Sequence, residues 1–582
     1  MLSSRRSRSR SRHTVKLVGL VGTLVLVAAC TTGVAGSALP AGTVTAATGT
    51  STGDPTGQIT QPSVLPSQSS SGSSATAAPG TTSSGTGAPS AVPAGLEKFY
   101  SQKLSWGSCG DYATNASDLR IYASAALQCA RMTVPMAYAD PTGPTVQVAL
   151  LRKVATDSSA RIGSLLMNPG GPGVSGMSFV SQVAAYGIAK QLNQRFDLVG
   201  FDPRGIGSSI PLIQCQTDAQ LDATRADPIR SETAAQVVQA NDQSKTYINE
   251  CLSATAAGGV DAKKFLANVG SRDVARDLDV TRAALGDNKL TYAGFSYGTR
   301  IGSVYAEEFP GNVRAMILDG AVDPDEDPAT DSLNQVKGFQ QAFIAYATSC
   351  AQQSTCPLGT DPQKATAVFQ SLTRPLLDKP LPLADGRVLS YSDATLAVGN
   401  VLYDNANWPD LTTAVTALVN GNGAGLMAQA DDYYGRTTAG KYTRKPDAFN
   451  AIRCVDGPRM TDPGDVTKLN AEEAAAAPFE DSGDPPANIP DVCAYWPVPP
   501  TLEPHILKVP GLPKVVVIST TGDPATPYAA GVHLAKQLGA NLITYQGTRH
   551  TAYLTAGSKC VDAAGNAYLI DLTLPGTDAK CS

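Results

Sequence analysis

A serine placed between two glycines is the first feature of this sequence whose spacing predicts catalysis. Gly294-Phe295-Ser296-Tyr297-Gly298 fits the G-x-S-x-G pattern, in which a nucleophilic serine stands on a sharp turn between a strand and a helix. A chain this rich in Gly and Ser would contain the pattern by chance roughly once in every two or three cases. The alternative is a serine in an ordinary loop, so the surrounding elements must decide.

A serine hydroxyl is a weak nucleophile, so a base must be found elsewhere in the chain. If export removes the N-terminal segment, the remaining histidines are His505, His533 and His550. His533 lies inside an amphipathic helical pattern, and His505 lies in a Pro-rich segment before a strand. In α/β hydrolases the order along the chain is serine, acid, histidine. We therefore expect His550, in QGTRHTAY after the last predicted strand, to be the base; the alternative is a histidine in a surface loop.

The acid should follow a strand between the serine and the base. Asp523, in STTGDPATP, directly follows such a strand and is our candidate for fixing the tautomer of the histidine. It could instead simply cap the helix that begins near Thr526. Asp319 and Asp323, which follow the strand at 313–318, are the rival acids.

Two backbone N–H groups are needed to stabilise the oxyanion. One should belong to Tyr297, the residue after the nucleophile, and the other to a loop that follows an early strand. The Gly-rich loop 168–173 is suitably placed, and we nominate the N–H of Gly171. A Gly-rich loop can also hold phosphate, but the chain has neither G-x-x-x-x-G-K nor G-x-G-x-x-G with a following acid. No nucleotide or other cofactor is expected.

The elements around these residues alternate between apolar strands and helices, which predicts a buried, mostly parallel sheet. Ser296 ends one of these strands and begins a helix, which is the context that the motif requires. The expected strands are 145–155, 162–171, 196–205, 290–295, 313–320, 514–520 and 541–547. The expected helices are 174–192, 274–286, 297–309 and 526–539.

A helical insert interrupts this alternation. Residues 326–505 contain mostly helical patterns, and the strand–helix order resumes after them. We therefore expect an α/β core in two parts, 96–325 and 506–582, with residues 326–505 as a lid over the cleft. Residues 30–95 consist almost entirely of Ser, Thr, Gly, Ala and Pro, which predicts a disordered tether.

The first 29 residues have the composition of an export signal. A basic start is followed by the 13 apolar or small residues 17–29, too few for the roughly 20 that span a bilayer. Cys30 follows directly, in V-A-A-C, which resembles the lipobox of bacterial lipoproteins. We expect lipidation of Cys30 and attachment to the outer face of the cell membrane, with release from the cell as a further possibility. The alternative is ordinary cleavage beside an incidental cysteine, and Arg5-Arg6 leaves the export route open.

Charge and cysteine content agree with export. Removing residues 1–29 removes six basic and no acidic side chains, which changes the formal net charge from −5 to −11 and opposes nucleic-acid binding. Without Cys30, ten cysteines remain, an even set that suggests disulfides. No C-x2-C pair occurs, so no zinc or other metal site is expected. The simplest pairing is sequential: Cys109–Cys129, Cys215–Cys251, Cys350–Cys356, Cys454–Cys493 and Cys560–Cys581.

Several longer motifs together resemble a known group of enzymes. NPGGPGVSG, FDLVGFDPRGIGSS, YAGFSYGTRIGSVYAEEFP, ILDGAVDP, AIRCVDGP and GDPATP…RH are similar to secreted actinobacterial tripeptidyl aminopeptidases. These are α/β-hydrolase peptidases related to prolyl aminopeptidase, and the lipid-anchored envelope serine proteases of mycobacteria look similar. The resemblance covers about residues 95–582 and implies an α/β-hydrolase fold with Ser296, Asp523 and His550 as the triad. It also implies a C-terminal segment typical of the group, closed here by Cys560 and Cys581.

The sequence departs from this group in two places. The usual Gly-His-Gly around the base is Arg549-His550-Thr551 here, and the early loop begins with Asn-Pro rather than His-Gly. The group acts on peptides with free amino termini, so an anion should hold the substrate's ammonium. Asp456, in AIRCVDGP, is our candidate; the alternative is an ion pair within the lid, with Arg453 or Arg459.

The sequence therefore predicts an exported, monomeric serine exopeptidase that releases short peptides, such as tripeptides, from peptide or protein substrates. A carboxylesterase or lipase would use the same triad, and a non-catalytic binding protein on a hydrolase scaffold is a further alternative. The length and sequence of the released peptide, the oligomeric state and the choice between peptide and ester remain open.

Overall fold

The computed structural model describes residues 91–227 and 229–582. The expected signal segment, Cys30 and all but the last five residues of the expected tether lie outside the described residues. The described chain contains a nine-stranded sheet in the order β1-β2-β4-β3-β5-β6-β9-β10-β11. Its strands are β1 (Leu127–Pro135), β2 (Thr145–Lys153), β3 (Gly163–Asn168), β4 (Phe196–Asp202), β5 (Leu290–Phe295), β6 (Val313–Asp319), β9 (Val516–Thr520), β10 (Asn541–Tyr545) and β11 (Ala579–Cys581).

The expectation of a mostly parallel sheet is confirmed from β4 to β11, where every neighbouring pair is parallel. Strand β2 differs, because it pairs antiparallel with both β1 and β4. Its first four residues alternate between exposed and buried, which is typical of an antiparallel strand with one face toward solvent. The sequence analysis grouped this strand with the parallel ones and did not expect β1 or β11.

Helices cover both faces of the sheet. Successive side chains of most strands point to opposite faces and belong to two different hydrophobic clusters, one on each face. One face packs against α8 (Ser271–Ala284), α9 (Tyr297–Glu308) and α17 (Tyr528–Leu538). The other packs against α3 (Gly176–Ala185), α4 (Lys190–Arg195) and α18 (Lys559–Asp571). The helix expected at 174–192 is therefore two helices. Gly187, at φ 68°, lies in the turn that separates them.

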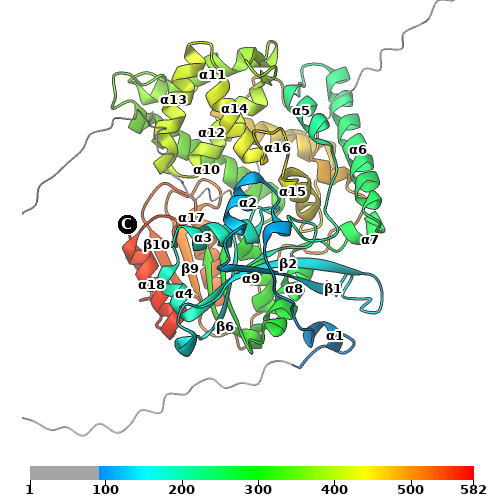
Figure 1. Ribbon diagram of the computed structural model, residues 1–582. Helices are drawn as coiled ribbons and strands as arrows, with labels where there is room; N and C mark the ends of the chain where they lie inside the picture. The colour runs from blue at the N-terminus through cyan, green and yellow to red at the C-terminus, as the bar shows by residue number, and fades with distance from the viewer. Residues whose placement is uncertain (1–90, 228) are drawn as a thin grey trace, which may run out of the picture. The chain divides into compact units, whose positions relative to one another are not determined.

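The segment between β6 and β9 is predominantly helical and has a hydrophobic core of its own (Figure 1). In that core the rings of Phe343 and Phe479 stack with centroids 4.8 Å apart. The helices of the insert are α10 (Pro328–Cys350), α11 (Ala365–Thr373), α12 (Tyr391–Leu402), α13 (Trp408–Val419), α14 (Ala424–Tyr434), α15 (Lys445–Arg453) and α16 (Pro463–Ala476). Helices α10 to α14 pack around this core, whereas α15 contributes Ala448, Ala451 and Ile452 to a cluster shared with the sheet.

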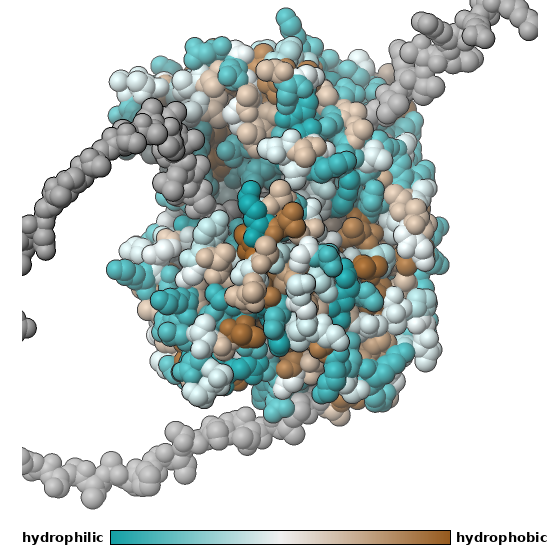
Figure 2. Space-filling model, in the orientation of Figure 1, coloured by the Kyte–Doolittle hydropathy of each residue, from teal (hydrophilic) through white to brown (hydrophobic). Residues whose placement is uncertain are grey.

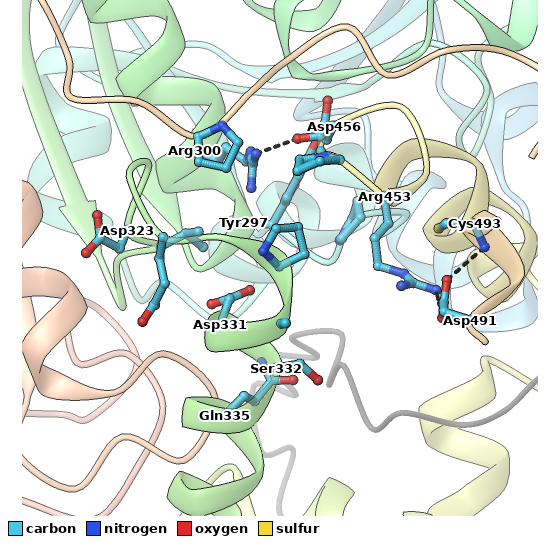
Figure 3. Close-up of a pocket in the computed structure, with 18 of the residues that line it drawn as sticks. Tyr297, Arg300, Asp323, Asp331, Ser332, Gln335, Arg453, Asp456, Asp491 and Cys493 are labelled. Carbon is cyan, nitrogen blue, oxygen red and sulfur yellow. Dashed lines mark hydrogen bonds and ion pairs between the residues drawn. The ribbon is translucent and has the colours of Figure 1, made fainter. Parts of the chain in front are cut away.

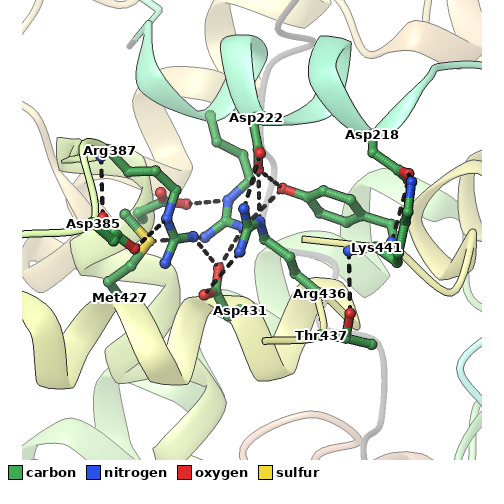
Figure 4. A network of polar contacts seen from close by, with 12 residues as sticks. Asp218, Asp222, Asp385, Arg387, Met427, Asp431, Arg436, Thr437 and Lys441 are labelled. Carbon is green, nitrogen blue, oxygen red and sulfur yellow. Dashed lines mark hydrogen bonds and ion pairs between the residues drawn. The ribbon is translucent and has the colours of Figure 1, made fainter. Parts of the chain in front are cut away.

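A second helical segment joins the insert from the first half of the chain. It comprises α5 (Asp218–Ala226), α6 (Ala234–Ala257) and α7 (Ala262–Leu266), which we assigned to the core. The buried guanidinium of Arg225 on α5 pairs with Asp393 at 3.0 Å and with Asp431 at 2.7 Å, both in the insert. Figure 4 shows Arg387 and Arg436 converging on Asp431 in the same network. The two ion pairs of Arg225 attach α5 to the insert.

The structure contains the five disulfides of the sequential pairing. On the face that Figure 2 shows, hydrophobic side chains occur in small groups among hydrophilic ones. Within residues 91–227 and 229–582, no helix is both long enough and apolar enough to cross a membrane.

Candidate active site

Ser296 stands at the turn between β5 and α9, near the centre of the sheet. Its backbone has φ 54° and ψ −127°, a conformation that costs energy for a residue other than glycine. The serine is 3% exposed, and its N–H donates to the carbonyl oxygen of Asp319 at 2.8 Å, at the end of the neighbouring strand β6. A strained, supported serine at this point is the geometry of a nucleophile on a sharp turn.

The two glycines of the motif allow this turn to close. A Cβ on Gly294 would lie 2.4 Å from the carbonyl oxygen of Gly298, and a Cβ on Gly298 would lie 2.6 Å from that of Asn168. Any side chain at either position would collide with backbone, so both glycines are required where strand and helix approach each other. If GFSYG were a chance match in an ordinary loop, neither of these close contacts would be expected.

His550 and Asp523 form a buried pair at the carboxyl ends of β9 and β10. The Nδ1 atom of His550 lies 2.8 Å and 2.9 Å from the two carboxylate oxygens of Asp523. The hydroxyl of Thr526 lies 3.1 Å from Asp523 Oδ2 and 3.2 Å from His550 Nδ1. Helix α17 begins only at Tyr528 and has no side-chain cap, so Asp523 is not its cap. Asp523 orients the imidazole instead.

The imidazole also lies beside the stretch of β6 that supports the nucleophile. A Cβ on Gly320 would lie 3.0 Å from His550 Cε1, and Gly320 directly follows Asp319, whose carbonyl oxygen accepts from the N–H of Ser296. The end of β6 therefore contacts both the serine turn and the histidine ring. Strands β5, β9 and β10, with β6 between the first two, bring the serine, the acid and the histidine to one edge of the sheet.

The rival acids and histidines have other partners. Asp323 Oδ2 lies 2.5 Å from Nδ1 of His533, and His505 Nε2 lies 2.8 Å from Glu307 Oε2. The carboxylate of Asp319 accepts from the N–H groups of Ala552 and Tyr553. Burial raises the pKa of Asp319 to about 7. Asp319 thus holds the loop behind His550, while Asp523 contacts the imidazole.

The Gly-rich loop after β3 lies against the serine turn, as expected for an oxyanion hole. Gly171 has φ 111° and lines the same pocket as Ser296 and Tyr297. A Cβ on Gly170 would lie 2.9 Å from the backbone nitrogen of Tyr297, so the two loops are in contact. Tyr297 is the first residue of α9, where N–H groups have no acceptor within the helix. This arrangement suits two N–H donors to one oxyanion.

The pocket over Ser296 is lined by both apolar and charged side chains, and several of the charged ones are acidic. Figure 3 shows Asp331 on α10, and Asp456 and Asp491 beyond α15, among the residues that line it. Burial raises the pKa of Asp331 to about 6. Burial and the nearby carboxylates of Asp331 and Asp323 raise the pKa of Glu326 to about 7. Such crowding of carboxylates favours a cationic group in the cleft.

Asp456 lines this pocket, but its carboxylate already accepts three hydrogen bonds. The N–H of Ser271 donates to Oδ1 at 2.7 Å, and the hydroxyls of Ser271 and Tyr297 each donate to Oδ2 at 2.6 Å. The expected alternative, an ion pair with Arg453 or Arg459, is wrong: Arg453 pairs with Asp491, and Arg459 donates to backbone carbonyls. Asp456 therefore holds Tyr297, one of the expected oxyanion residues.

Sequence reasoning missed Asp331, Glu326 and Thr526. Thr526 lies three residues after the acid in GDPAT, and its role depends on a turn that only the structure reveals. Asp331 and Glu326 belong to DPDEDPATDS (323–332), an acidic run directly after β6. That run was a usable signal, because segments after the parallel strands reach the edge that holds the site.

The chain is similar to several known proteins over most of its length. The family described as alpha/beta hydrolase fold matches residues 163–556. Serine protease Hip1 of Mycobacterium tuberculosis is 45% identical over 492 residues, which cover 82% of this chain and 91% of that protein. Carboxylesterase B of the same species is 42% identical over 480 residues, or 82% and 90% of the two chains. Tripeptidyl aminopeptidase of Streptomyces coelicolor is 29% identical, covering 78% and 82%.

Proposed function

The chain belongs to the alpha/beta hydrolase fold family and is a serine hydrolase, and we propose that it is an exopeptidase with the triad Ser296, His550 and Asp523. The pairing of His550 with Asp523 beside the strained turn of Ser296 is the observation that supports this triad most directly. The lining of the cleft, with five carboxylates against three arginines, supports the choice of peptides with a free amino terminus. The similarity to a tripeptidyl aminopeptidase supports release of short peptides.

In the proposed reaction, Ser296 Oγ attacks the scissile carbonyl while His550 Nε2 takes its proton. Asp523 keeps the Nδ1 proton of His550 in place and stabilises the imidazolium that forms. The N–H groups of Gly171 and Tyr297 donate to the oxyanion of the tetrahedral intermediate. His550 then protonates the leaving amine, and water hydrolyses the acyl-enzyme by the same steps.

We propose Asp331 as the main partner of the substrate's ammonium, assisted by Glu326. The carboxylate of Asp331 faces the pocket and makes no hydrogen bond or ion pair within the described part of the chain. Asp456, the candidate from the sequence, has both oxygens engaged by Ser271 and Tyr297. Burial raises the pKa of Asp331 to about 6, and the guanidinium of Arg300 offsets that rise only in part. A buried carboxylate without a hydrogen-bond partner therefore gains from a bound ammonium.

Asp331→Asn should selectively impair substrates with a free amino terminus. We expect kcat/KM on a tripeptide anilide to fall about 10- to 100-fold, the effect of losing one hydrogen bond to a charged group. The acetylated tripeptide anilide and a short-chain ester should change by less than about twofold, because neither carries the ammonium. Asp456→Asn is the matched control and should impair all three substrates, since it loosens Tyr297. If Asp331→Asn lowered kcat/KM equally on all three substrates, Asp331 would not be the residue that binds the ammonium.

The pH dependence provides a second readout of the same site. Because the pKa values of Asp331 and Glu326 are raised to about 6 and about 7, both carboxylates become neutral as the pH falls below that range. The ratio of kcat/KM for free over acetylated substrate should therefore fall with falling pH. Titration of His550 cancels in this ratio, because both substrates use the same base. A ratio that is constant from pH 5 to 7 would contradict the role of these carboxylates.

Ester hydrolysis is the second candidate function, favoured by the similarity to carboxylesterase B. The same triad can cleave an ester, so the two functions are separated by assay and not by the catalytic residues. Purified wild-type protein that hydrolyses the ester but neither tripeptide anilide would exclude the peptidase and leave the serine hydrolase in place. The acidic cleft argues for peptides.

We also propose that the protein is exported and anchored through a lipid on Cys30. The five disulfides support an oxidising compartment. Mass spectrometry of membrane fractions should find Cys30 as a lipidated N-terminus, and Cys30→Ala should move the protein out of the membrane fraction. An unmodified N-terminus in wild-type protein would instead support ordinary cleavage.

A further inference from the structure

Arg549, the residue before His550, makes polar contacts with its own loop and with the insert. Its guanidinium lies 3.0 Å from a carboxylate oxygen of Asp404, a residue of the helical insert. The same side chain donates to the carbonyl oxygens of Thr551 at 3.0 Å and Thr555 at 2.9 Å. It is 8% exposed. Arg549 therefore holds together the loop that carries His550 and also connects this loop to the insert.

The backbone of the insert contacts the base at the same place. The N–H of His550 donates to the carbonyl oxygen of Tyr403 at 2.7 Å, and Asp404 and Arg549 form an antiparallel bridge. The ring of Tyr403 meets the imidazole of His550 edge-on, with centroids 5.5 Å apart. Tyr403, which follows α12, thus touches both the backbone and the ring of His550.

This contact extends to the helix that carries Asp331. The ring of Tyr403 also packs edge-on against Phe339 of α10, with centroids 5.3 Å apart. Tyr403 therefore lies between α10, which lines the substrate cleft through Asp331, and the imidazole. A movement of α10 would therefore be transmitted to the imidazole of His550 through the ring of Tyr403.

The loop of the base needs such support because its backbone is strained. Thr551 and Leu554 have φ values of 61° and 62°, in the left-handed region that residues other than glycine seldom adopt. Strained backbone persists only where surrounding contacts determine it, and Arg549 supplies two of these contacts at the carbonyls of Thr551 and Thr555. Loss of the guanidinium would let the loop relax and the imidazole move.

We propose that Arg549 is a positioning residue which, with Tyr403 and Asp404, makes the placement of the catalytic base depend on docking of the helical insert. The proposal rests on the proposed role of His550. The insert then has two tasks, since it shapes the cleft and also holds the imidazole in line with Ser296. Without its contacts at Tyr403 and Asp404, the base would be misplaced even with substrate bound.

Arg549→Met and Asp404→Asn test this proposal. We expect kcat on both the free tripeptide anilide and the neutral ester to fall about 10- to 100-fold for Arg549→Met and less for Asp404→Asn, with KM within about twofold. The rate at which a fluorophosphonate labels Ser296 should fall in parallel, because that reaction also needs the base. The double variant should be no worse than Arg549→Met alone, since both act through one contact.

Arg374→Met is the matched control, because it breaks an Arg–Asp pair of similar length, 2.8 Å to Asp481, within the insert and away from the base. It should leave kcat unchanged and shift the thermal midpoint less than Arg549→Met, because the side chain of Arg374 is 37% exposed and that of Arg549 only 10%. Unchanged kcat in folded Arg549→Met, or an equal loss in Arg374→Met, would overturn the proposal. Wild-type activity that persists in Ser296→Ala would instead overturn the proposed function, so the two failures are distinguishable.

Discussion

Replacing Ser296 by alanine is expected to lower kcat on every substrate by about 10⁶, the order of magnitude seen when a serine nucleophile that works with a histidine is lost. The effect should be the same for tripeptide anilides and for a short-chain ester, because all pass through an acyl-enzyme on this oxygen. The measurement is kcat under saturating substrate, together with labelling by a fluorophosphonate, which should disappear.

The fold should tolerate this change. Ser296 is held by its backbone, whose N–H donates to Asp319 and whose carbonyl accepts from Thr299, and alanine keeps both contacts. Ser303→Ala is the matched control, because Ser303 is another buried serine, on the helix that follows Ser296, and its hydroxyl donates to the carbonyl oxygen of Arg300. It should retain full activity. Residual activity above about one part in 10³ in Ser296→Ala would mean that another group attacks the substrate.

The serine turn was predictable because its signals are local. The apolar run 290–295, the two glycines and the amphipathic stretch after them each restrict a few neighbouring residues, and together they specify strand, turn and helix. The choice of Asp523 and His550 followed from the order serine, acid, histidine along the chain and from their places after predicted strands. No long-range contact had to be guessed for either residue.

The misplaced or missing parts all depend on contacts between distant segments. The directions of β1 and β2 are set by pairing, and an isolated strand pattern does not encode its partner. Helix α5 joins the insert through Arg225, whose partners Asp393 and Asp431 lie more than 160 residues further along the chain. The proposed role of Arg549 likewise depends on Tyr403 and Asp404, which the insert contributes, and helical patterns in the sequence do not reveal such docking partners. Asp331 is the exception, because the acidic run 323–332 was a usable signal.

Asp523→Asn is expected to lower kcat by about 10⁴, because an amide in place of the carboxylate favours the wrong tautomer of His550. In the structure both oxygens of Asp523 face Nδ1, so the amide of asparagine would present an N–H to the nitrogen that must itself carry a proton. The turn should survive, since the remaining oxygen can still accept from the N–H groups of Ala525 and Thr526. KM should change little, and kcat on a neutral ester is the cleanest measurement.

Two further variants decide whether the acid is assigned correctly. Asp323→Asn alters the partner of His533 and should leave ester hydrolysis within about threefold of wild type, since Asp323 does not contact His550. Asp319→Asn affects the loop behind His550 through Ala552 and Tyr553, so its loss should be smaller than that of Asp523→Asn. If Asp319→Asn were instead the more damaging change, the carboxylate that stabilises the imidazolium would be at the end of β6. Asp523 would then serve mainly to fold its own turn.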